Sequence, residues 1–503
     1  MQTQYIRFSK NSRFSWTSRS AKTLGITFSN DNASYVTNNI IPKALEFKKC
    51  LKQWEHRKLT LIGKVTVIKT FALPKLVFPF TVLPNPPDTL VDDLTKAMFA
   101  FIWDNKPDKI KREQMYKSKE DGGLNVPNLK LFVQSIKTSW IKRYIDENNH
   151  GKWKLFFDNI LSKRGGSLIF DCNVAYSDTY NICGHNQFLN EMLKAWVTLK
   201  PKIKNDARKC IIWNNSDIKV NNESLYYKQW HEKGVLYLEH IFDFRINRFY
   251  TFDLIQYLYD IPPHDFLRYA QLTKSIPNYI KNNLATSNIN IQTEFNSNLI
   301  VIKSKKKLSK YLYDSQIKNT HFKPKHMDKW EEMFNQQLDW QQIYKMPYIS
   351  TIDTSLQVFQ FKIINRIIPT NKYLLKCNIT SSSLCGLCLH NVETIIHMFW
   401  ECPVIQELWQ ALQVFFNSKG INIELNVQNI LFGITVSNNN NRNNSIIMLM
   451  KYFIFCAKYK EVVPIFSHFE RFLQKRIDIE REIAISKNKL NIHLRKWDSF
   501  IND

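Results

Sequence analysis

The chain has 503 residues, too many for one ordinary core, so we expect several packed units. Hydrophobic residues make up 44% of it and aromatic residues 14%, which excludes disorder throughout, and only 12 glycines occur, which favours helices. A net charge of +26 indicates a polyanionic partner, and we expect nucleic acid.

Other classes of protein fit the sequence less well. Neither GxGxxG nor GxxxxGK[ST] occurs, so a fold that depends on a glycine-rich phosphate loop is not expected. No small-molecule substrate is expected. Lysines interrupt the most apolar stretches, at 65–84 and 446–457, so no membrane partner is expected. The N-terminus lacks an apolar signal segment and the nine cysteines are an odd number, which indicates an intracellular protein of the nucleus or cytoplasm.

In chain order, TLGITFSND at 23–31 predicts a short strand, and an apolar stripe over 40–54 predicts a helix. A second helix is expected within 54–78 and is broken or bent at Pro74. Its polar face would carry a basic stripe, which suits a phosphate backbone, although a solvated lysine face has the same pattern. The stripe consists of Arg57, Lys58, Lys64, Lys69 and Lys75.

A helix capped by Asp88 or Thr89 is expected next, followed by a basic loop over 109–132 with a tight turn at Gly122-Gly123. Further candidate phosphate contacts precede and open this loop at Lys106, Lys109, Lys111 and Arg112. Residues 130–160 and 327–416 have helical patterns, whereas 165–300 are polar and rich in asparagine. The run SNNNNRNNS at 437–445 predicts a loop or linker, and two helices are expected to end the chain.

The segment CGLCLHNVETIIHMFWEC at 385–402 holds three of the nine cysteines and has the spacing of a metal site. Two cysteines separated by two residues form a knuckle, and a histidine and a third cysteine can complete a tetrahedron, for which zinc is the favoured ion. The expected ligands are Cys385, Cys388, His397 and Cys402. His390 lies too close to Cys388 to be included, and Gly386 is expected to relieve strain in the knuckle.

The alternative is that these cysteines are small buried apolar residues and that His397 is a satisfied core histidine. Four ligand-type residues within so short a segment favour the metal site. Four ligands would leave no open position, so the zinc is expected to be structural or to support recognition, not to be catalytic.

Several of these pieces, in this order, resemble one family. LGITFS, WEHRKLTLIGKVTVIKTFALPKLVFPF, FIWDNKP, GGLNVPNLKLF and ETIIHMFWECPVIQELW resemble the thumb, the region after it and the C-terminal zinc knuckle of reverse transcriptases from LINE-type non-LTR retrotransposons, which are transposable elements. The resemblance covers 22–145 and 355–416 well and 146–354 loosely. It implies a mainly α fold with a helical thumb-like unit, a mixed middle region and a helical C-terminal unit that bears the zinc knuckle.

The resemblance also implies boundaries. We expect a palm remnant at 1–36, a thumb-like and post-thumb helical region at 37–160, a poorly defined linker or middle region at 161–326, a helical zinc-knuckle domain at 327–436 and C-terminal helices at 445–503. The paired aspartates on which the family's polymerase relies to hold two metal ions are expected to be missing, because Asp92-Asp93 lies within a helical pattern. The chain therefore resembles a truncated copy derived from an RNA-directed DNA polymerase, not active alone.

Such a fragment is expected to bind RNA or an RNA–DNA hybrid. The alternative is a zinc-stabilised protein-interaction scaffold, in which the basic charge has no role in nucleic-acid binding.

Overall fold

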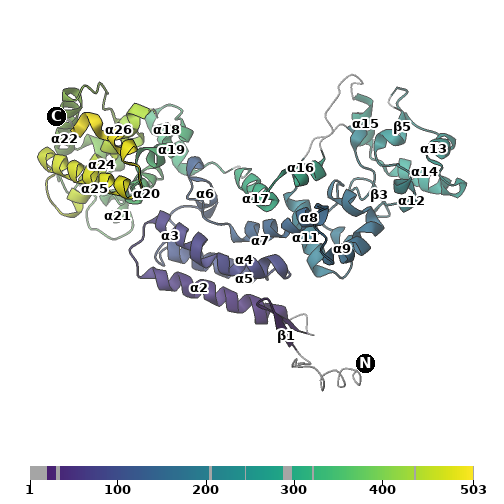
Figure 1. Ribbon diagram of the computed structural model, residues 1–503. Coiled ribbons are helices and arrows are strands. Elements are labelled where there is room, and N and C mark those ends of the chain that lie inside the picture. Colours follow the sequence, from purple (N-terminus) through teal and green to yellow (C-terminus); the bar gives the residue numbers. More distant parts are fainter. Residues whose placement is uncertain are drawn as a thin grey trace, which may run out of the picture. The chain divides into compact units, whose positions relative to one another are not determined.

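The computed structural model describes residues 20–29, 34–202, 207–243, 245–286, 297–319, 322–435 and 438–501. Within these ranges the chain is mainly α-helical, with three small two-stranded antiparallel sheets, which confirms the predicted fold class (Figure 1). The chain divides into two units, each built from three segments. Unit 1 comprises Met1–Cys50, Phe71–Ala97 and Asn128–Thr320, and unit 2 comprises Leu51–Thr70, Met98–Pro127 and His321–Asp503. The predicted domain boundaries remain predictions.

The chain passes from one unit to the other five times, and three of these passages fall within α2 (Ile41–Glu55), η2 (Ile68–Ala72) and α5 (Asp88–Ile102), where η denotes a short 3₁₀ or π helix. The helix expected over 40–54 is α2. The second expected helix is divided into α3 (Leu61–Val67), η2 and α4 (Pro74–Val82), and α4 begins at the proline expected to break it. Thr60 begins α3, because its side chain accepts a hydrogen bond from Gly63 N at 3.1 Å.

Unit 1 contains, in addition to α4, strands β1 (Ser20–Thr23), β2 (Ile26–Ser29), β3 (Lys219–Val220), β4 (Glu223–Ser224), β5 (Phe242–Asp243) and β6 (Arg248–Phe249). Its helices are η1 (Val36–Ile40), α7 (Leu129–Lys137), α8 (Ser139–Ile145), α9 (Trp153–Leu161), η4 (Ser162–Arg164), η5 (Gly166–Phe170), α10 (Thr179–Cys183), α11 (Gln187–Leu199), η6 (Ala207–Lys209), α12 (Lys228–Glu232), η7 (Leu238–His240), α13 (Phe252–Tyr259), η8 (Pro263–Asp265), α14 (Phe266–Ser275), α15 (Asn278–Thr286), α16 (Asn298–Ser304) and α17 (Leu308–Lys318).

The strand predicted near residue 26 is one half of a hairpin. β1 pairs with β2 in antiparallel register, with Thr23 opposite Ile26. Leu24 and Gly25 form the two-residue turn and both have positive φ, 48° and 81°. Positive φ at both central positions is the conformation that matches the twist of paired strands.

The core of unit 1 lies between residues 141 and 312 and is rich in tryptophan. Buried indole nitrogens need hydrogen-bond acceptors, and this core supplies them. Trp196 donates to Phe170 O at 2.9 Å, and Trp230 donates to the Asp265 carboxylate at 2.8 Å. The polar, asparagine-rich region expected at 165–300 therefore contains a packed core made of short elements.

Unit 2 contains α3 and the following elements: α6 (Arg112–Tyr116), η3 (Lys119–Asp121), α18 (Lys325–Phe334), α19 (Trp340–Ser350), α20 (Thr354–Ile364), α21 (Asn371–Lys376), η9 (His397–Glu401), α22 (Pro403–Ser418), α23 (Val427–Phe432), α24 (Asn438–Tyr459), α25 (Phe466–Ser486) and α26 (Leu490–Ile501). Its core extends from Trp330 to Trp497. Helix α24 is the centre of this core, because it packs against α19, α20 and α25 (Figure 1).

The asparagine run at 437–445 differs from the predicted loop, because α24 begins within it. Asn444 is completely buried. Its Oδ1 accepts from Ile434 N at 2.7 Å and its Nδ2 donates to Ile434 O at 3.0 Å, so one side chain completes the backbone hydrogen bonds of the preceding segment. Asn444 therefore fixes α24 to the segment before it, although an asparagine-rich composition suggests a linker.

The tight turn at Gly122-Gly123 is confirmed. Gly122 has φ +78°, and Gly123 N donates to Ser118 O at 2.8 Å. A Cβ on Gly123 would lie 2.1 Å from Lys117 O, so the turn requires glycine there.

Among the described residues no single helix is long and apolar enough to cross a membrane, although Leu61–Ala72 and Pro74–Val82, a bent pair, pass that test together by length and composition.

Candidate metal centre and basic surface

The four predicted metal ligands converge in unit 2. One ligand atom from each of Cys385, Cys388, His397 and Cys402 lies within 4.8 Å of the other three. Cys385 Sγ is 4.0 Å from Cys402 Sγ, and Cys388 Sγ is 3.4 Å from His397 Nε2. The distance between the Cys385 and Cys402 sulfurs is too long for a disulfide, whose sulfurs lie about 2.05 Å apart.

The same distances fit a tetrahedral ion. Zinc bonds of about 2.3 Å to sulfur and about 2.0 Å to nitrogen place two sulfurs roughly 3.8 Å apart, and sulfur and nitrogen roughly 3.5 Å apart. The observed 4.0 Å and 3.4 Å separations are close to these values. The donor set of three thiols and one imidazole suits zinc.

Short backbone contacts hold the knuckle in shape. Cys385 N donates to Asn391 O at 2.8 Å, and Leu387 N donates to Cys385 Sγ at 3.4 Å. The second contact shows a backbone amide of the knuckle turned toward a cysteine sulfur. An isolated antiparallel bridge between Leu384 and Val392 closes the loop.

Helical segments supply the other two ligands. His397 begins η9, and Cys402 is the N-cap residue of α22. Pro403 takes the first position of α22, where a missing N–H has no cost. The last ligand is therefore fixed by the start of a helix of 16 residues.

The thiols differ in acidity. Burial raises the pKa of Cys385 and raises the pKa of Cys402 to about 12. Burial acts on Cys388 in the same direction, but hydrogen bonds from the backbone amides of Asn391 and His390 and from His397 outweigh it and lower the pKa of Cys388 to about 6. Because a metal binds thiolates, zinc binding would release the protons of Cys385 and Cys402.

Two further predictions concerned His390 and Gly386 of the knuckle, and they had different outcomes. His390 is exposed and stands outside the ligand cluster, as predicted. Gly386 does not relieve strain, because its φ is not positive and a Cβ there would meet nothing within 4 Å. The residue with positive φ is Leu389, at 62°. The strain in this turn is therefore carried by a leucine with an exposed side chain.

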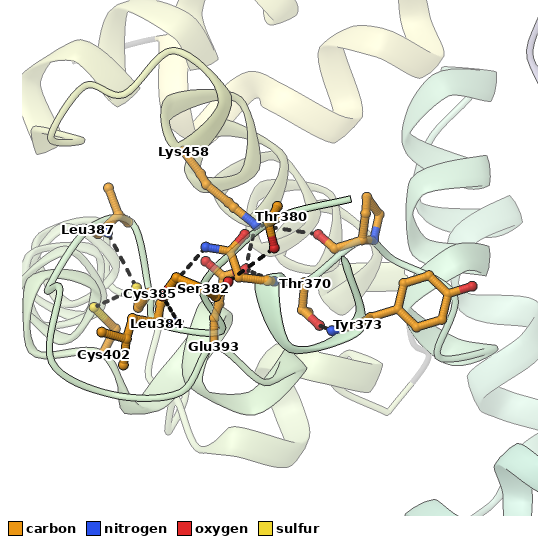
Figure 2. A network of polar contacts seen from close by, with 12 residues as sticks. Thr370, Tyr373, Thr380, Ser382, Leu384, Cys385, Leu387, Glu393, Cys402 and Lys458 are labelled. Carbon is orange, nitrogen blue, oxygen red and sulfur yellow. Dashed lines mark hydrogen bonds and ion pairs between the residues drawn. The ribbon is translucent and has the colours of Figure 1, made fainter. Parts of the chain in front are cut away.

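A buried ion pair joins the knuckle to helix α24 (Figure 2). The side chain of Glu393 is 1% exposed and that of Lys458 is 9% exposed, and the two are in direct contact. Glu393 also accepts from Asn371 N at 2.7 Å, while Glu393 N donates to Ser383 O at 2.8 Å. Sequence reasoning missed this pair, because its members are 65 positions apart.

The predicted basic stripe is not one continuous surface. Lys64 is buried, and its Nζ donates to Ile102 O at 3.1 Å and contacts Asp104 at 2.5 Å. The ammonium group of Lys64 is therefore paired within unit 2. Lys64 was expected from the sequence to contact a phosphate, and its burial differs from that expectation. Arg57 and Lys58 are exposed but precede α3, so they lie outside the helix on which they were expected.

The other cations predicted to contact phosphates differ in how exposed they are. Lys69 and Lys75 are half-buried, whereas Lys106, Lys109 and Lys111 are exposed on the segment before α6. Arg112 is partly engaged, because Nε donates to Asp108 at 2.7 Å and the guanidinium lies 4.6 Å from the centre of the Phe99 ring. All of them except Lys75 belong to unit 2.

The adjacent acidic pair Asp92-Asp93 lies within α5, as expected from the helical pattern, and both residues are exposed. Asp93 contacts Lys48 at 2.5 Å, and both side chains are largely exposed. This arrangement is a surface ion pair.

Comparison with known protein families identifies the segment that carries the metal cluster. Residues 325–409 match the model of a family described as zinc-binding in reverse transcriptase. The match begins at α18 and ends within α22, so it contains all four ligands and Glu393. Residues 325–409 are therefore a reverse-transcriptase-associated region with a cluster of three cysteines and one histidine that can hold zinc.

Proposed function

We propose that this chain is the nucleic-acid-binding C-terminal region of a reverse transcriptase from a LINE-type non-LTR retrotransposon, and that it binds RNA or an RNA–DNA hybrid. One observation carries the proposal: the segment that matches the reverse-transcriptase zinc-binding family contains four metal-ligand side chains whose ligand atoms lie within 4.8 Å of one another. The sequence resemblance of 22–145 to the thumb and the region after it extends the same assignment toward the N-terminus.

The charge of the chain supports a polyanionic ligand. The excess of 70 lysines and arginines over 44 acidic residues gives a long-range field that attracts nucleic acid. The exposed cations Arg57, Lys58, Lys106, Lys109 and Lys111 belong to unit 2, the unit that contains the metal cluster. Exposed lysines without a fixed carboxylate partner can exchange their counterions for phosphates.

Zinc has a structural role in this proposal. Four protein ligands fill a tetrahedral site, so no position is left for a water or a substrate. The ion would fix the 385–402 segment against α22, and the Glu393–Lys458 pair would fix it against α24. The chain then acts as a binding region that works with a polymerase active centre, and not as a polymerase alone.

Salt dependence of binding to a labelled single-stranded RNA tests the proposal. If about four phosphates are contacted, affinity should fall roughly 50-fold between about 50 mM and 200 mM salt. Equal affinity at both concentrations, or no binding at either, would exclude the proposal and favour the scaffold alternative. Robust primer extension on an RNA template by the purified chain would contradict the statement that it lacks polymerase activity alone.

A further inference from the structure

A basic pocket lies within unit 2, beside the end of α21. Its volume is about 530 Å³. Segments far apart in the sequence line it: the loop before α6, the first half of α18, the residues after α20 and the end of α21. Its cations are Lys109, Lys111, Lys325, Lys329, Arg366 and Lys376.

The pocket has no acidic counterpart among the described residues that line it. Three carboxylates close in sequence to the lining residues pair with cations that do not line the pocket. Asp328 and Glu331 contact Lys323 at 2.6 Å and 3.2 Å, and Asp108 contacts Arg112 at 2.7 Å. Six cations therefore share one concave surface without local neutralisation, an arrangement that an anionic ligand would stabilise.

Arg366 is the most constrained cation in the pocket. Its backbone has φ +57°, which is unusual for a residue with a side chain, and its guanidinium lies 4.3 Å from the centre of the Trp330 ring. One terminal nitrogen, Nη1, is buried without a hydrogen-bond partner among the described residues. Stacking fixes the plane of the guanidinium while leaving its charge unpaired, and a planar fork of donors suits two oxygens of a phosphate.

The pKa values of two cations in this part of unit 2, Lys362 and Arg366, are lowered. Burial lowers the pKa of Lys362, and the charges of Lys109 and Lys64 lower it further. Burial likewise lowers the pKa of Arg366, although an arginine stays charged at neutral pH. A bound phosphate would relieve this repulsion.

An aromatic ring beside the cations indicates which kind of phosphate fits. Tyr373 also lines the pocket, is 42% exposed, and extends away from the cysteines (Figure 2). An exposed ring beside a basic groove is the arrangement by which proteins stack the bases of a single strand. Free inorganic phosphate would use the cations but not the ring.

We propose that this pocket binds an internal phosphodiester group of single-stranded nucleic acid, with Arg366 holding the phosphate, the surrounding lysines holding the flanking phosphates, and Tyr373 stacking on a base. The inference rests on the proposed function and specifies where the strand binds.

Two variants of the zinc-loaded full chain test the pocket with a labelled single-stranded RNA that lacks a 5'-phosphate. Arg366→Gln removes the central cation, and a triple variant with Lys109, Lys329 and Lys376 each changed to Gln removes exposed charges while keeping the Trp330 stack. The matched control changes Arg471, Lys475 and Arg481, three exposed cations of α25, to Gln. Melting temperature and zinc content identify any variant that fails to fold.

Arg366→Gln should weaken binding about tenfold and lower the salt slope by about 0.7, the value for one lost contact to a single strand. The triple pocket variant should lose more affinity than the triple control. Equal losses in the two triple variants would overturn the pocket and leave the proposed function intact, whereas no binding by the wild type would overturn both. Binding that requires a 5'-phosphate would assign the pocket to a chain end and would also overturn the internal site.

Discussion

The ion pair between Glu393 and Lys458 gives the sharpest test of how the knuckle is held. We predict that Lys458→Met destabilises the knuckle by about 3 kcal/mol, because it leaves a buried carboxylate without its cation. Lys458 is slightly exposed, which places the effect at the lower end of the roughly 3–5 kcal/mol seen when one partner of a buried pair is removed. The remaining donor to the carboxylate is Asn371 N at 2.7 Å.

A second substitution should reverse most of this loss. Glu393→Gln removes the charge but keeps an amide oxygen that can accept from Asn371 N. The double variant Lys458→Met with Glu393→Gln should therefore be more stable than Lys458→Met alone, although it has lost both members of the pair.

Cobalt substituted for zinc provides a local assay, since its visible absorption reports on the ligand set of the knuckle alone. Urea titration of that absorption measures the free energy of unfolding of this region. Lys460→Met is the control, because Lys460 is exposed and follows the end of α24 directly. The reasoning is refuted if Lys458→Met lies within about 0.5 kcal/mol of Lys460→Met.

Three further predictions concern unit 2. Burial and the charge of Arg366 lower the pKa of His326 to about 4. The stability that neutral His326 contributes is therefore complete above its ordinary pKa of 6.5 and is lost as the pH falls toward 4. Between about pH 7 and pH 5, urea titrations should show the wild type losing about 2 kcal/mol more than His326→Gln. Equal losses would contradict this. Lys64→Met should cost about 1–3 kcal/mol of stability without weakening RNA binding, whereas Lys58→Met should do the reverse, as urea titration and salt slopes would show. Gly123→Ala should lower the melting temperature because of its clash with Lys117 O, while Gly386→Ala should leave both melting temperature and zinc content unchanged; a zinc loss in Gly386→Ala would show that the knuckle needs this glycine.

The sequence predicted features that depend on nearby residues. Cys385, Cys388, His397 and Cys402 lie within 18 positions, so their spacing alone could indicate a shared ion. Pro74 and the Gly122-Gly123 turn were predictable for the same reason, because proline and glycine restrict or free the backbone at their own positions. The mainly α fold followed from apolar periodicity and scarce glycine.

Features that depend on distant segments were not predictable. Lys64 has the spacing of a surface lysine, and only the position of Asp104 and Ile102 O shows that it is buried. Asn444 looks like part of a linker until Ile434 is placed beside it. Arg366, in the apolar run IINRII, gave one local signal: a cation among residues that belong in a core. The five residues that share its pocket charge come from three other segments of the chain.

Metal analysis tests the central claim, a structural zinc in the reverse-transcriptase-associated segment, most directly. Purified wild-type chain should contain about one zinc per molecule, Cys388→Ser should contain much less, and Cys377→Ser, which changes an exposed cysteine outside the cluster, should match the wild type. Equal zinc in wild type and Cys388→Ser, or no zinc in the wild type, would contradict the account.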